Sequence, residues 1–136
     1  MKYDIVSLLS AMLNNVGLSD VMDQNLSNHA TISLNMKGDI PTIHIKTDES
    51  GQVWVWSKLC EYNITALSYS SANLFPLMFS YNEEVFYCGQ PCLYPVEGNL
   101  ELRAQIKNEH LESPEAFLVF LDHYLTFLQD YRMVLV

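Results

Sequence analysis

The segment at residues 51–59, GQVWVWSKL, constrains the fold most, because it is apolar on both sides. In a β-strand successive side chains point to opposite faces of the sheet, so Val53 and Val55 would share one face. Trp54 and Trp56 would share the other, and neither face is polar. Such a strand lies either in a sheet covered on both faces or in a sheet whose second face is covered by a partner chain. The alternation does not decide which face belongs to the core.

Two shorter alternating runs precede this segment. Residues 29–36 read HATISLNM and residues 40–47 read IPTIHIKT, and in both runs apolar side chains alternate with polar ones. The breaks at residues 37–39 (KGD) and 48–51 (DESG) have the length and composition of hairpin turns. The three runs together predict an antiparallel meander.

Helices are predicted near both ends of the chain. Apolar residues recur at helical spacing over residues 5–16, with Asp4 in the N-cap position and Gly17 just past the end. Residues 113–115 (SPE) provide a capping side chain, a proline for the first turn and a carboxylate near the positive end of a helix. Residues 117–128 then repeat the apolar spacing of a helical face.

A third helix is predicted at residues 63–80, NITALSYSSANLFPLMFS, which carry no charge and are apolar almost all round. Such a helix must be covered on more than one side. Pro76 should kink or end it, because proline has no N–H and clashes with the preceding turn. Two explanations are open: the helix forms a subunit interface, or it is a central core helix.

A second hairpin is predicted within residues 87–107, with its turn at residues 96–99 (VEGN). The strand after this turn alternates apolar and polar side chains, so it has one wet face. The resulting order is helix, three strands, helix, two strands, helix, with no internal repeat or linker. We therefore predict one α+β domain over residues 1–136, an antiparallel sheet of about five strands with three helices.

Composition and charge exclude several classes of partner. The apolar share is 49%, the charged share 17% and the net charge −9, which describe a folded acidic protein that repels nucleic acid and anionic membranes. The N-terminus lacks a signal-peptide pattern and no apolar run is long enough for a membrane span, so we expect a cytosolic protein. Cys60, Cys88 and Cys92 are then most simply free thiols.

The sequence points to binding rather than to catalysis. It contains no P-loop, dinucleotide fingerprint or GxSxG, and the Cys88–Cys92 spacing has no second pair that would complete a metal site. We therefore expect no enzyme activity, cofactor or metal. Each tryptophan, if exposed, would leave roughly 150 to 250 Å² of aromatic surface in water. Such surface suits a dimer interface or a peptide-binding groove.

The order and spacing of these segments resemble the class IB type III secretion chaperones of Gram-negative bacteria, over nearly the whole chain. The matching pieces are TISL at 31–34, PTIHI at 41–45, VWVW at 53–56 and GNLELRA at 98–104. Two features depart from the family pattern. Asn28 stands before His29 where we associate a serine with the family, and residues 82–95 look unlike the family.

The resemblance implies a non-catalytic homodimer in the bacterial cytoplasm that binds the N-terminal regions of type III effectors in extended form. It would keep them soluble and aid their delivery to the export apparatus, with the secretion ATPase as a further candidate partner. The residues that we predict for effector binding are Val6, Leu9, Ile32, Leu34, Ile43, Ile45, Trp54 and Trp56. Those predicted for the dimer interface are Leu67, Leu74, Leu77, Met78, Leu93 and Tyr94.

Two other functions remain open on the sequence. A small acidic immunity or adaptor protein would bind a folded partner through surface carboxylates, and its affinity would fall steeply with salt. A small oligomeric enzyme with a hydrophobic pocket would need convergent polar groups, for which the sequence offers only isolated histidines and carboxylates.

Overall fold

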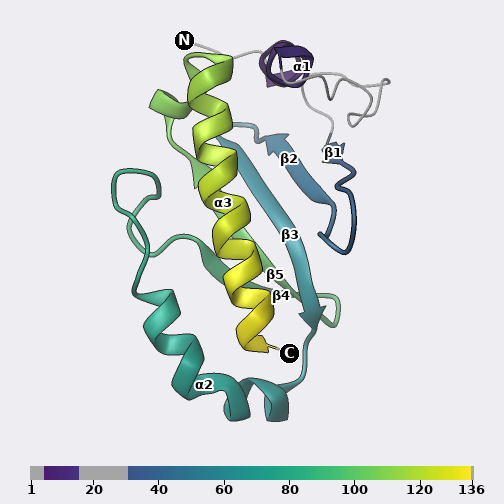
Figure 1. Cartoon of the computed structure of the whole chain (residues 1–136), viewed down its shortest axis with the longest axis vertical. Coiled ribbons are helices and arrows are strands. Elements are labelled where there is room, and N and C mark those ends of the chain that lie inside the picture. Colours follow the sequence, from purple (N-terminus) through teal and green to yellow (C-terminus); the bar gives the residue numbers. More distant parts are fainter. Residues whose placement is uncertain (1–4, 16–30, 136) are drawn as a thin grey trace.

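The computed structural model describes residues 5–15 and 31–135 (Figure 1). The elements are α1 (Ile5–Asn15), β1 (Ile32–Leu34), β2 (Ile43–Thr47), β3 (Val53–Glu61), α2 (Ile64–Met78), β4 (Cys92–Val96), β5 (Asn99–Ile106), a 3₁₀ turn (Asn108–Leu111) and α3 (Pro114–Leu135). The predicted order of three helices and five strands is confirmed. The expected cap Asp4, the expected end at Gly17 and the residues Asn28 and His29 lie outside the described residues.

The five strands form one antiparallel sheet in the order β1-β2-β3-β5-β4. The meander β1-β2-β3 is confirmed, and the second hairpin adds β5 beside β3 and places β4 at the far edge. One row of register partners crosses four strands on the same face: Ile32, Ile45, Val55 and Ala104. All four side chains are fully buried, so this face is the core face.

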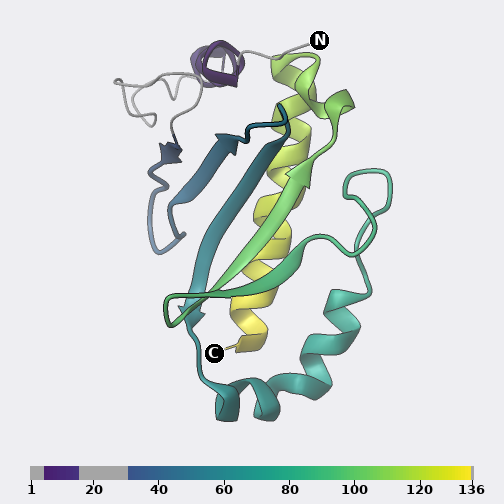
Figure 2. The same cartoon turned by 180° about the vertical axis from the view of Figure 1, so that it is seen from behind.

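Among the described residues, the helices cover only one face of the sheet. Helix α3 runs along the core face and packs against α1 and α2 (Figure 1). Seen from behind, the strands lie in front and no described helix crosses them (Figure 2). None of the described helices combines the length and apolar content needed to cross a membrane. We call the uncovered side the open face.

The core is fixed by aromatic side chains of α3. Tyr124 is fully buried and its hydroxyl donates to the carbonyl of Leu102 on β5 at 2.7 Å. Burial raises the pKa of Tyr124 above its ordinary value, so the phenol stays neutral. Phe120 contacts Phe86 edge-on, with ring centroids 5.6 Å apart. Phe86 thereby anchors in the core the segment at residues 82–95 that least resembles the family.

Helix α2 lies outside the sheet, beside α3 (Figure 1). It begins after Asn63, whose side-chain oxygen accepts from the N–H groups of Thr65 and Ala66 at 3.0 and 3.2 Å, and it ends two residues beyond Pro76. Leu74 is its only buried side chain. Of the two explanations that the sequence left open, the structure therefore excludes a central core helix.

Candidate functional site: the open face of the sheet

The structure shows which face of strand β3 belongs to the core. Val53 and Val55 are 1% and 0% exposed and pack beneath the helices. Trp54 and Trp56 point to the opposite side and are partly exposed. The open face therefore carries both tryptophans, where a polar face would be expected for a sheet with one side in water.

Trp56 is the centre of an aromatic and cationic cluster on this face. His44 on β2 stacks on its indole with ring centroids 5.6 Å apart. The Arg103 guanidinium on β5 lies 5.1 Å from the Trp56 ring and 5.3 Å from the Tyr94 ring, within cation–π range of both. Arg103 is held by Glu101 through N–H···O contacts of 2.9 Å. We call these five residues the Trp56 cluster.

The strand register explains why these residues meet. His44 and Arg103 are the register partners of Trp56 on its two neighbouring strands, so all three point to the same face. The His44 Nδ1 also lies 3.1 Å from the Ser33 hydroxyl on β1. Burial lowers the pKa of His44 against a smaller opposite effect of Glu101, so this imidazole is neutral at pH 7.

Trp54 is fixed by the β2–β3 turn. Its indole N–H donates to one oxygen of the Asp48 carboxylate at 2.9 Å. The other oxygen accepts from the N–H groups of Ser50 and Gln52 and from the Ser50 hydroxyl. These hydrogen bonds, with that of Trp54 the largest contribution, lower the pKa of Asp48. The turn therefore presents an ordered indole on the open face.

The structure divides the residues that we predicted for effector binding between the two faces. Those that fill the core and are at most 1% exposed are Leu9, Ile32, Leu34, Ile43 and Ile45. A partner cannot contact these side chains while this packing holds. Val6 is partly buried against the core on α1, and only Trp54 and Trp56 lie on the open face.

Three members of the Trp56 cluster were not predicted from the sequence as binding residues: His44, Arg103 and Glu101. The alternation of β2 and β5 places them opposite the core face, which is a usable signal. Their contact with Trp56 depends on β5 lying beside β3, and that pairing is not local in sequence.

The residues predicted for a dimer interface lie mostly on the inner side of α2. Leu74 is 6% exposed, and Leu67, Leu77, Met78 and Leu93 pack partly against the core. Tyr94 is 53% exposed but belongs to the Trp56 cluster. The outer side of the helix and its C-cap carry exposed apolar residues that were not among those predicted: Ile64, Tyr69, Phe75 and Phe79, which are 54% to 93% exposed.

Comparison with known proteins identifies the family of this chain. Residues 17–97, more than half of the chain, match the model of the Invasion protein B family (SpaK). The crystal structure of the Yersinia pestis type III secretion chaperone SycH, in complex with a stable fragment of YscM2, is similar with a TM-score of 0.58 and 11% identity. This similarity covers 90% of the present chain and 95% of that chain, and at such low identity it supports the fold alone. A search of curated proteins found no match. The chain therefore belongs to the Invasion protein B family and is a type III secretion chaperone.

Proposed function

We propose that this type III secretion chaperone holds an N-terminal segment of its effectors in extended form on the open face of the sheet. The observation that carries the proposal is the position of Trp54 and Trp56 on a sheet face that no described helix covers. An extended segment places alternate side chains against such a face. Among the described strands, β1 and β4 form the edges of the sheet, and an edge strand can pair with an added extended segment.

The aromatic side chains of the open face can offset the free-energy cost of ordering a client segment. Ordering a disordered segment on binding costs about 2 to 5 kcal/mol or more, so the bound state needs much apolar contact. Burying a large side chain contributes about 1.5 to 3 kcal/mol. Several client side chains packed on the indoles would offset the ordering cost. The chaperone would act by binding alone, without catalysis or a cofactor.

We further propose that the chain works as a homodimer joined through the outer side of α2. Tyr69, Phe75 and Phe79 expose 93%, 54% and 76% of their surfaces, and α2 carries no charged residue. Exposed apolar surface of this kind marks an interaction site. A second copy would cover it with an identical apolar surface.

The proposal also includes where the client is bound and where it is delivered. The chaperone would bind effectors in the bacterial cytoplasm, keep them secretion-competent and hand them to the export apparatus, where the secretion ATPase is the partner to test.

The deciding experiment is a pull-down of the tagged chain from the cytosol of its own bacterium, followed by limited proteolysis and mass identification of the protected fragments. We expect protected N-terminal segments of secreted proteins. Recovery of one intact folded partner would contradict the proposal and favour an immunity or adaptor protein.

A further inference from the structure

A basic depression adjoins the open face. It has a volume of about 450 Å³ and lies where the start of β2, the end of β3 and the C-terminal part of α3 meet. The residues that line it are Pro41, Thr42, His44, Lys58, Leu59 and Arg132. We call this site the basic depression.

Its charge is opposite to that of the molecule. The chain has only seven lysines and arginines against sixteen aspartates and glutamates, yet Lys58 and Arg132 both line this one site. No carboxylate belongs to its described lining, and Pro41 and Leu59 give it an apolar part. An anion that is repelled elsewhere by the net charge of −9 would be accepted here.

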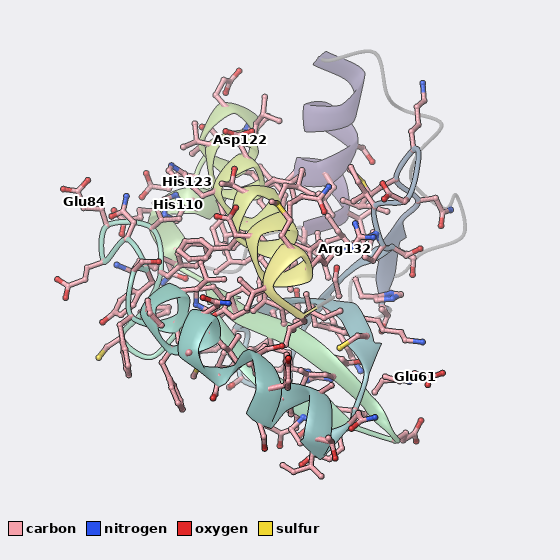
Figure 3. The ribbon with its side chains drawn as sticks, turned by 60° about the horizontal axis from the view of Figure 1, so that its bottom comes forward. Glu61, Glu84, His110, Asp122, His123 and Arg132 are labelled. Atoms are coloured by element: carbon pink, nitrogen blue, oxygen red, sulfur yellow. The ribbon has the colours of Figure 1, made fainter. Side chains whose placement is uncertain are left out.

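The two cationic groups retain donors for a ligand. Arg132 donates one N–H to Gln129 at 2.8 Å, and its other terminal nitrogen lies 3.7 Å from Asp39, beyond hydrogen-bond distance. The Asp39 side chain is 91% exposed and can move aside. Arg132 lies on the side of α3 toward β1 and β2 (Figure 3). Lys58 has no ion pair with any described residue.

The basic depression is continuous with the site proposed above. His44 lines it and also stacks on Trp56, so a segment that covers Trp56 passes the opening. The planar guanidinium of Arg132 is suited to a carboxylate, which it can bind through two parallel N–H···O bonds.

We propose that the basic depression receives one aspartate or glutamate side chain of the client segment, with a neighbouring apolar client side chain against Pro41 and Leu59. This inference rests on the proposed function and names the chemistry of its client. Alternating apolar contacts alone leave an extended segment free to slip by two residues. The basic depression brings two cations, Lys58 and Arg132, to one place. It would favour the register that puts an acidic client side chain there, because the net charge of −9 disfavours such a side chain over most of the surface.

The test is a double-mutant cycle on the client segment recovered by protease protection. The segment is synthesised, each Asp or Glu is replaced in turn by Asn or Gln, and dissociation constants are measured against the full chain by titration calorimetry. We expect one replacement to weaken binding about tenfold, which is about 1.4 kcal/mol. Against the variant carrying Lys58→Gln and Arg132→Gln, that same replacement should have no effect.

Two further variants distinguish an effect of the basic depression from an effect of the overall charge of the protein. Lys46→Gln removes one positive charge from the exposed open-face side of β2 but leaves the basic depression intact, so the tenfold effect should persist. Asp39→Asn removes the competing carboxylate beside Arg132, so binding should be unchanged or tighter.

The outcomes distinguish this inference from the proposed function. A protected segment without any acidic residue, or one whose amide replacements act equally on wild type and the double variant, would overturn the inference alone. Failure to recover any protected segment would overturn the proposed function and this inference with it.

Discussion

Trp56 differs from its neighbour Val55 mainly in the face of the sheet to which it points. We predict that Trp56→Ala leaves the chain folded, with a loss of about 1 to 2 kcal/mol in the free energy of unfolding, because Trp56 is only partly buried and its contacts with His44 and Arg103 disappear. Affinity for a client segment should fall by at least about tenfold, as for a buried aromatic anchor. Urea unfolding and calorimetric titration measure the two effects.

The matched control is Val55→Asp on the adjacent residue. Val55 is 0% exposed, so an unpaired carboxylate there should prevent folding. If Trp56→Ala folded and bound the client as wild type does, Trp56 would lie outside the binding site.

The buried hydroxyl of Tyr124 contributes to the stability of the fold. Tyr124→Phe removes the hydroxyl that donates to the Leu102 carbonyl, which costs about 1 to 2 kcal/mol because a buried hydrogen bond is lost. Client binding should be unchanged, since Tyr124 lies in the core beneath the sheet. Urea unfolding at pH 7 and a client titration check both statements.

The same substitution changes the dependence of stability on pH. The folded pKa of Tyr124 is raised mainly by burial, and that of Tyr131 is raised to about 12 by the same cause. Above pH 10 the unfolded chain releases these protons while the folded chain keeps them, so stability is full below pH 10 and falls above it. Tyr124→Phe should reduce this fall by up to about 1.4 kcal/mol per pH unit. Equal slopes between pH 9 and 11 would contradict a buried neutral Tyr124.

The exposed side of helix α2 provides a test of the proposed dimer. Replacing Phe75 and Phe79 together by serine removes exposed apolar surface without disturbing the core, so we predict folded monomers in place of dimers. Light scattering on a sizing column measures the mass. The control replaces Leu118 and Val119 by serine, an exposed apolar pair on α3, and should leave the dimer intact. A monomeric wild type, or a dimer that survives the α2 change, would contradict the proposed interface.

The helices and strands could be predicted from local sequence patterns. Which neighbouring elements or chains cover each of them could not. Alternation identified the strands β1, β2 and β3, and the capping residues near Ser113 marked the start of α3. An uncharged helix such as α2 has the same sequence whether its own core or a second chain covers it. Likewise, alternation divides Val55 from Trp56 but does not say which side α3 will cover, because that depends on contacts distant in sequence.

The prediction of effector-binding residues shows the same limit. Ile32, Ile43 and Ile45 are apolar enough for a binding site, and they are buried because α1 and α3 lie on their side of the sheet. Arg103 looked like an ordinary polar-face residue of β5. It gains its place beside Trp56 only through the β3–β5 pairing, which joins strands separated by α2 and β4.

Because the whole molecule has a net charge of −9, the dependence of affinity on salt distinguishes binding of an extended segment from binding of a folded basic partner. A segment held mainly by Trp54, Trp56 and sheet edges should bind with an affinity that changes less than about tenfold between 0.05 and 0.5 M salt, because aromatic burial is not screened. A folded basic partner bound through surface carboxylates should lose affinity far more steeply over this range. Dissociation constants measured across the salt series decide between them. A steep loss would place the interaction on the acidic surface and remove the open face as its main site, since Arg103 and Glu101 of the Trp56 cluster are paired with each other and leave little net charge for salt to screen.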